Sequence, residues 1–479
     1  MSGFRESSHR ILSGPLGLEV ARFGTPLALG MGLQTAFNLV DAYIIGELSH
    51  DVASPALGAI GICDQLAALG TIVSYGFTVA SGAQLSQKAG QNDHDAVRRI
   101  GLQSLILVLA LSLVFGALGL FGATWFVRDA VGAKGGVAAL GVPYLRVMMG
   151  GSFSIFLLLH LTGTLRALGS SKTPVLLMLV ANVLNLFLAV VLVYGPGPAP
   201  LVFSWGPPIA RALSLPRMEL MGAAWATLLA RVIVLPPLLW ILIKRLGYWE
   251  RRPSLSPDLP TLREIAKMGW PSSAQLVVRI LAMLFTHALV ARSFTTADDQ
   301  SATTALGIVF RLETMALFIG LGWGSAAQTF IGQNLGATNT SRAKTSGWYA
   351  AAFNAVTMTL LALCYWGFGR RLVSLFDSDP NVVALGVDDF RWVGLSYVGL
   401  GTGVVLGSAI QGAGATRQAL MLDAAVVMLL QLPASLLAVS LPHATPSALF
   451  KAVSLTDFAF ALVHAYSYWR GRFLRTAMA

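Results

Sequence analysis

Charged residues are scarce in this chain of 479 residues, where Asp, Glu, Lys and Arg make up 11% and hydrophobic residues 55%. Soluble domains carry about 25% charged residues. So little charge excludes an ordinary soluble globular protein and indicates a chain surrounded largely by lipid. The net charge of +11 follows the loops between apolar runs, so we expect membrane lipid rather than nucleic acid as its surroundings.

Cysteine and catalytic motifs are also nearly absent. Cys63 and Cys364 both lie in apolar runs, and we expect small buried side chains there rather than a disulfide or a metal pair. No His-Glu-x-x-His, no phosphate-binding loop and no Gly-x-Ser-x-Gly with partner residues is present. We therefore expect neither an enzyme nor a cofactor, and without a nucleotide site any energy that the protein uses must come from an ion gradient or from the gradient of a substrate.

Long apolar runs are what the chain has in abundance. A helix needs about 20 mostly apolar residues to cross the hydrocarbon core of a bilayer. Twelve such runs predict an all-α integral membrane protein, with spans at 22–47, 54–78, 101–126, 137–163, 174–195, 220–243, 264–292, 303–330, 346–368, 384–410, 418–440 and 444–468.

The second half of the chain repeats the first at a spacing of 245 residues. Pro26 is matched by Pro271, and Leu140-Gly141-Val142 by Leu385-Gly386-Val387. Ser86-Gln87-x-x-Gly90 meets Gly332-Gln333-x-x-Gly336 with a slip of one residue. Six spans per copy return the second copy in the same orientation, which predicts two six-helix lobes related by a parallel pseudo-two-fold axis.

Domain limits and orientation follow from these spans. We expect an N-lobe at 1–243 with an outer insertion at about 196–216, a cytoplasmic linker at 244–263, and a C-lobe at 264–479. With both termini inside, inner segments hold 20 of the 33 Lys and Arg residues and outer segments hold 10. The positive-inside rule then predicts a multi-pass protein of the plasma membrane (the bacterial inner membrane) with both termini cytoplasmic.

Polar residues form a stripe on the first span. Gln34, Asn38 and Asp41 are spaced i, i+4 and i+7 and therefore share one helical face. Ionisable groups at membrane depth are costly, so this face is expected to look into protein or water. The alternative is a structural Asp41 that reaches water at the headgroups.

Further polar residues lie on other spans. Asn182 and Asn185 are on the fifth span, Thr227 on the sixth, and Asp64 on the second. An Asn in a helix bundle commonly bonds helix to helix, and Asp64 is equally compatible with a functional or a structural role.

The second copy differs at the stripe. Arg279 occupies the position equivalent to Gln34, and Thr286 the position equivalent to Asp41. A buried Arg needs a partner, and Glu313 is our candidate for a pair that is structural or lines a C-lobe cavity.

Several segments together resemble the multidrug and toxic compound extrusion (MATE) family over essentially the whole chain. They are Phe37-Asn38-Leu39-Val40-Asp41, Leu165-Arg166-Ala167-Leu168-Gly169, Asn182-Val183-Leu184-Asn185, Gly222-Ala223-Ala224-x-Ala226-Thr227 and Gly332-Gln333-Asn334-Leu335-Gly336. The resemblance implies two six-helix lobes of the MATE/MOP type that expel amphiphilic, often cationic, compounds in exchange for Na⁺ or H⁺.

The resemblance also implies a coupling-ion site at Asp41, Asn185 and Thr227, with Gln34, Asn38 and Asn182 beside it. A fourth ligand of some relatives corresponds to Ala189, and the C-lobe acids of other branches correspond to Arg279 and Leu400. These departures leave Asp41 as the expected sole coupling carboxylate. Hard cations prefer oxygen ligands and removal from water favours a protonated carboxyl; both H⁺ and Na⁺ stay open, with Ala189 favouring H⁺.

The predicted function is a monomeric secondary antiporter for amphiphilic, cationic organic compounds, in which Asp41 alternates between substrate and ion. The first alternative is a flippase of the same superfamily, for lipid-linked precursors or of the polysaccharide type. A membrane-embedded enzyme would need a nucleophile or metal cluster at bilayer depth, and a channel would not need two matched lobes.

Overall fold

The computed structural model describes residues 2–251, 254–296 and 299–475, and within these ranges it contains helices and no strands. The expected all-α class is therefore confirmed. In chain order the helices are α1 (Ser2–Ser13), α2 (Leu16–Gly46), α3 (His50–Gly90), α4 (His94–Thr124), α5 (Gly135–Gly150), α6 (Ser152–Ala167), α7 (Lys172–Tyr194), α8 (Gly206–Ala212), α9 (Glu219–Leu246), α10 (Leu259–Ser293), α11 (Ser301–Gly336), α12 (Thr340–Ser374), α13 (Pro380–Val393), α14 (Tyr397–Gly412), α15 (Thr416–Val426), α16 (Leu432–Ser440) and α17 (Pro446–Arg470).

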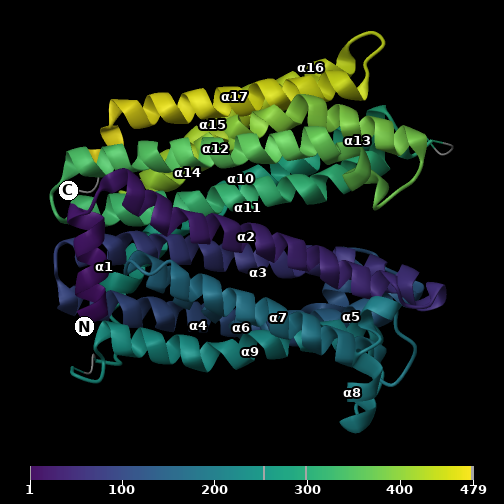
Figure 1. Ribbon diagram of the computed structural model, residues 1–479, viewed down its shortest axis with the longest axis horizontal. Helices are drawn as coiled ribbons and strands as arrows, with labels where there is room; N and C mark the ends of the chain where they lie inside the picture. Colours follow the sequence, from purple (N-terminus) through teal and green to yellow (C-terminus); the bar gives the residue numbers. More distant parts are fainter. Residues whose placement is uncertain (1, 252–253, 297–298, 476–479) are drawn as a thin grey trace.

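Ten membrane-spanning candidates are found in the described part of the chain, and the bent pair α5–α6 brings the number to as many as eleven. α2 is a further helix of 31 residues that runs alongside them (Figure 1). Large apolar side chains on the outside, such as Phe121 at 86% exposure, suit a surface covered by lipid. The count of twelve spans stays a prediction.

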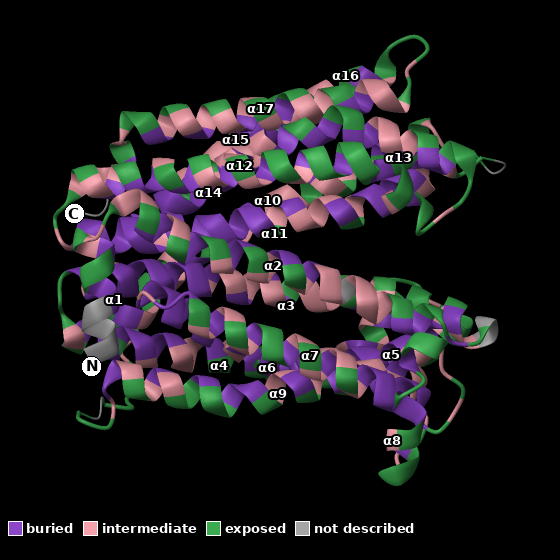
Figure 2. Ribbon diagram, viewed as in Figure 1, coloured by how far each residue is buried: buried purple, intermediate pink, exposed green. Residues whose placement is uncertain are grey.

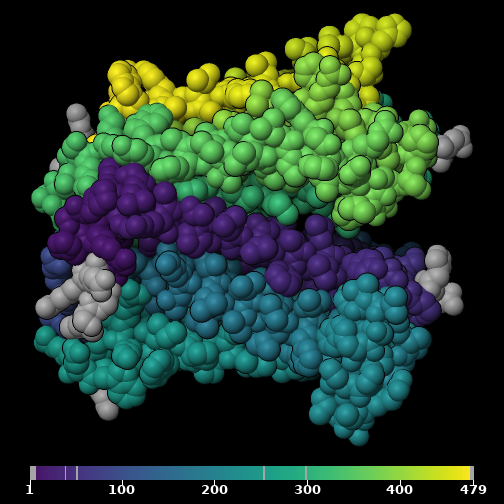
Figure 3. Space-filling view, in the orientation of Figure 1, coloured from purple at the N-terminus to yellow at the C-terminus, as the bar shows by residue number. Residues whose placement is uncertain are grey.

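The helices lie in two groups (Figure 1). α3–α9 fill the lower half of that view and α10–α17 the upper half, with α2 between them, and both chain termini lie at the same end of the bundle. We call this the terminal end. Figure 3 shows first-half residues packed against second-half residues there, and the two halves set further apart toward the opposite end. The division into two lobes and the linker at 244–263 stay predictions. In the structure α9 continues to Leu246 and α10 begins at Leu259, so only part of the predicted linker is non-helical.

Two predicted spans depart from a regular α-helix in the structure, and at equivalent places. The span at 137–163 is divided between α5 and α6 with a bend of 40°. The span at 384–410 is divided between α13 and α14 by a 3-10 turn at Gly394–Ser396. Gly151 and Ser396 are 245 residues apart, so the irregularity falls at the equivalent place in each copy, as a bend in the first copy and as a 3-10 turn in the second.

The repeated Gln-x-x-Gly segments pair with each other at the terminal end. A Cβ on Gly90 would lie 2.0 Å from the carbonyl oxygen of Gln333, and a Cβ on Gly336 would lie 2.0 Å from that of Gln87. The Gln87 amide donates to the carbonyl of Gly412 at 3.2 Å, and the Gln333 amide donates to that of Ala167 at 2.9 Å. We call this reciprocal arrangement the glutamine clamp.

Burial is concentrated around the clamp. Residues 329–336 on α11 are all buried, and Figure 2 shows buried residues gathered toward this end of α11 and α3. Because α3 and α11 contain the second predicted span of their respective copies, the clamp also marks the pseudo-symmetry axis.

The expected outer insertion contains a 3-10 turn at Leu201–Phe203 and the short helix α8. The ring of Phe203 stacks on Tyr194 at 6.1 Å between centroids, and α8 projects from the bundle in Figure 1. The insertion is thereby anchored to the end of α7.

Candidate functional site

Small residues bring α2, α7 and α9 close together. A Cβ on Gly222 of α9 would lie 2.6 Å from the backbone of Leu192 on α7, and a Cβ on Gly30 of α2 would lie 2.8 Å from the side chain of Val175 on α7. Small residues at such crossings allow close helix packing in membranes. The polar positions of three helices can therefore meet.

Asp41, Asn185 and Thr227 form a connected chain of hydrogen bonds. The Asn185 amide nitrogen donates to both carboxylate oxygens of Asp41, at 2.9 and 2.8 Å. The Thr227 hydroxyl donates to the amide oxygen of Asn185 at 3.1 Å. Asn185 is buried, and Asp41 is half-buried. The three residues that the family resemblance placed in one site are thus linked, with Asn185 in contact with both of the others.

The remaining residues of the expected site, as far as the structure describes them, do not join this chain of hydrogen bonds. Gln34 and Asn182 are half-buried, and among the described side chains neither hydrogen-bonds to Asp41, Asn185 or Thr227. The side chain of Asn38 lies outside the described residues. Ala189, four residues after Asn185, is 2% exposed and belongs to the apolar core, so it adds no oxygen to the site.

The sequence analysis did not bring together three charged and polar side chains that lie near Asp41, namely Asp64, Tyr144 and Arg231. Arg231 on α9 is close enough to interact electrostatically with both Asp41 and Asp64. Tyr144 on α5 donates from its hydroxyl to Asp64 at 3.1 Å. Arg231 follows Thr227 by four residues and hence shares its helical face; this spacing was the available signal.

The expected partner of Arg279 was wrong. Its guanidinium bonds Asp423 on α15, with Nε and Oδ2 2.5 Å apart, and lies over the ring of Phe460. His464 on α17 contacts the other oxygen of Asp423 at 3.0 Å. Asp423 on α15 meets Arg279 on α10 through a contact between helices that the order of residues along the chain does not reveal, whereas the sequence offered Glu313 only as an acid within the eighth span.

Glu313 instead belongs to a separate group of acids in the second half. It accepts a hydrogen bond from the Tyr397 hydroxyl at 3.1 Å and lies close enough to Asp389 to interact with it electrostatically. Asp457 accepts from the Ser396 hydroxyl at 2.8 Å. A cavity of about 120 Å³ is lined by Arg279, Glu313, Tyr397 and Asp457 together with further polar and apolar side chains. The second half therefore holds buried and half-buried carboxylates at positions that the family resemblance did not suggest.

The comparisons with known proteins agree with this architecture. The family model MatE matches residues 26–191 and 276–437. A protein of Bacillus subtilis named "Probable multidrug resistance protein YpnP" is 28% identical over 420 residues, covering 87% of this chain and 86% of its own. An "FAD transporter" of Shewanella oneidensis is 26% identical over 430 residues, covering 89% and 88%.

Among solved structures, one described as the outward-facing conformation of a multidrug resistance MATE family transporter of the MOP superfamily has a TM-score of 0.83. It is 20% identical and covers 98% of both chains, a level that shows a shared fold. The relatives are named as transporters or resistance proteins, not enzymes, and the apolar helices make this chain a multi-pass membrane protein. Because the family model covers more than half of its length, the chain belongs to the MatE family.

Proposed function

We propose that the protein is a secondary active efflux antiporter that expels amphiphilic, cationic organic compounds in exchange for H⁺ or Na⁺. It acts as a monomer in the plasma membrane, with both termini cytoplasmic. The relatives named as multidrug resistance proteins support the substrate class. The excess of basic residues in the segments at the terminal end supports the orientation.

The observation that carries the proposal is the contact of Asn185 with both oxygens of Asp41. A carboxylate held in a bundle by an amide is anionic only at a cost, and that cost falls when a proton, a metal cation or a cationic substrate neutralises it. Arg231 within electrostatic range keeps the anionic form accessible between these events. Asp41 can thus alternate between ion and substrate.

The orientation of Asn185 favours H⁺ within this proposal. Its nitrogen is turned to Asp41, and its oxygen accepts from Thr227. A Na⁺ ion would need the amide to turn over so that an oxygen faces the cation. A proton on Asp41 needs no such change, since the carboxyl can keep one oxygen as an acceptor for the Asn185 amide.

The test is uptake of a fluorescent cationic dye into everted membrane vesicles energised with an acidic interior, or with a Na⁺ gradient at constant pH. We expect Asp41→Asn to reduce ion-driven uptake to the level of vesicles that lack the protein. Asp129→Asn removes an exposed carboxylate outside the site and should leave uptake unchanged. Undiminished uptake by Asp41→Asn would exclude Asp41 as the coupling residue.

A second candidate is the export of anionic compounds such as flavin nucleotides or lipid-linked diphosphates. Two observations favour it: the relative named as an FAD transporter and the presence of Arg231 beside Asp41. Under this alternative Arg231 would bind the anionic group. The same vesicles separate the two candidates, because transport of flavin nucleotides with no transport of cationic dyes would replace the first proposal by the second.

A further inference from the structure

An open groove of about 760 Å³ lies at the terminal end, between the first turns of α10 and α15. It is lined by Leu259, Pro260, Arg263, Glu264, Lys267 and Arg417. Because the groove is open rather than enclosed, a ligand larger than a lone inorganic ion has access to it. We call it the basic groove.

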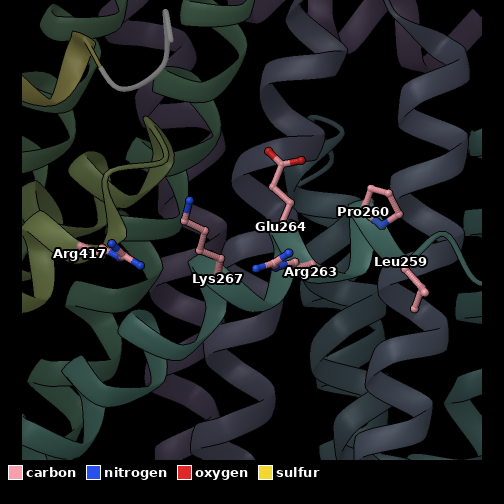
Figure 4. Close-up of a pocket in the computed structure, with 6 residues that line it drawn as sticks. All are labelled: Leu259, Pro260, Arg263, Glu264, Lys267 and Arg417. Carbon is pink, nitrogen blue, oxygen red and sulfur yellow. The ribbon is translucent and has the colours of Figure 1, made fainter.

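The three cations of the basic groove are available to a ligand. Arg263, Lys267 and Arg417 are exposed, and no described carboxylate lies within salt-bridge distance of any of them. Figure 4 shows the side chains of Arg263 and Arg417 extending toward the space beside Lys267, while the carboxylate of Glu264 points away from the guanidinium of Arg263. Three positive groups from two helices therefore face one space.

The equivalent place in the first copy is built differently. Subtracting 245 from Arg263, Lys267 and Arg417 gives Leu18, Arg22 and Lys172. Arg22 is paired with Glu19, with Nη1 and Oε1 3.3 Å apart. The first copy thus has one cation fewer and neutralises another, so the positive groove is a property of the second copy alone.

Apolar side chains next to the groove suit a lipid. Leu259 forms part of its wall and is 73% exposed, and Trp270, one turn beyond Lys267, is 52% exposed. Trp is enriched at the interface between headgroups and acyl chains. An exposed Trp beside a cluster of cations places the groove at headgroup level, and basic pockets between helices at that level recognise phosphate headgroups.

We propose that the basic groove binds the phosphate headgroup of an anionic phospholipid, with the guanidinium groups of Arg263 and Arg417 and the ammonium of Lys267 as its contacts and Leu259 against the start of an acyl chain. Binding there would hold the terminal ends of α10 and α15 together. The proposal does not depend on the transported substrate or on the coupling ion.

The test is native mass spectrometry of the purified full-length protein in detergent, titrated with phosphatidylglycerol. Each basic residue near an anionic headgroup contributes about 1 kcal/mol, or about fivefold in affinity. We expect Lys267→Gln with Arg417→Gln to weaken the tightest lipid-binding event about 25-fold. The equivalent pair in the first copy, Arg22→Gln with Lys172→Gln, should leave that event unchanged.

Three outcomes would overturn the proposal. Equal loss of lipid affinity in the two double variants would mean a general effect of surface charge. Equally tight binding of zwitterionic phosphatidylcholine would show that the groove does not select an anionic headgroup. Displacement of the lipid by millimolar inorganic phosphate, with phosphate binding at the same three residues, would assign the groove to a free anion. Charge reversal by Lys267→Glu provides a single variant with the same expected loss, should the double variant express poorly.

Discussion

At the scale of single residues, the second half of the protein depends on how its buried charges are matched. Arg279 and Asp423 are joined at 2.5 Å, and the Asp423 side chain is fully buried. His464, also fully buried, contacts the second oxygen of the same carboxylate. Removing one member of a buried ion pair lowers the stability of a protein by more than the intact pair contributes to it, because the remaining charge is left without a partner.

We therefore expect Arg279→Gln to lower the free energy of unfolding by about 3–5 kcal/mol, seen as a lower thermal midpoint of the purified protein. The double variant Arg279→Met with Asp423→Leu should recover much of that loss, because it removes both charges. Arg311 is exposed and forms no salt bridge with a described residue, so Arg311→Gln is the matched control. A double variant less stable than Arg279→Gln would contradict the pairing.

The sequence indicated the first-half site better than the second-half cluster for a physical reason. Asp41, Asn185 and Thr227 each stand out as polar residues within apolar spans, and the family resemblance joined them. In the second half, Asp389, Asp423 and Asp457 lie on three different helices, and which acid meets Arg279 depends on how those helices pack. Burial and partner choice of this kind are decided by tertiary contacts, which one sequence does not specify.

At the scale of helices, glycine sets how closely the two copies approach. Gly336 ends α11 where the backbone of α3 passes, and its missing Cβ is the space that the Gln87 carbonyl occupies. Helix α11 also contains Gly307, beside which nothing lies within 4 Å. The two positions share one helix and differ in what an added methyl group would meet.

Gly336→Ala should consequently destabilise the protein by about 1–3 kcal/mol, the usual cost of overpacking, because a backbone oxygen cannot move aside as a side chain can. Gly307→Ala should be neutral or stabilising by up to about 1 kcal/mol, since Ala is the better helix former. Thermal midpoints of both purified variants provide the measurement. Equal midpoints would show that α3 and α11 do not approach this closely.

The helix pattern itself was largely predictable, whereas its interruptions were not. Apolar length located the spans, but the breaks at Gly151 and at Gly394–Ser396 fall within continuous apolar runs. Such a break depends on packing against neighbouring helices, and only its recurrence at equivalent positions ties it to the repeat.

At the scale of the whole molecule, the glutamine clamp holds the two halves together at the terminal end. The sequence showed Gln-x-x-Gly as a repeat, but it did not show that the two copies of the motif pack against each other. Ser86 is fully buried at this contact, next to the space where a Cβ on Gly332 would fall. The antiport that we propose requires the site to be exposed to both sides of the membrane in turn, and under that proposal the clamp opens once per cycle.

A cysteine at position 86 reports on this opening. In a Cys364→Ser background, we expect Ser86→Cys to react slowly with a polar maleimide, because the thiol is reached only when the terminal end is open. Adding Gln333→Ala removes the hydrogen bond to the Ala167 carbonyl. A loss of about 1 kcal/mol should raise the open population, and with it the labelling rate, about fivefold. Ser341→Cys, exposed at the same end, should label at one rate with or without Gln333→Ala. If position 86 labels as fast as position 341 before the clamp is weakened, the closed terminal end is not the prevailing state of the protein in solution.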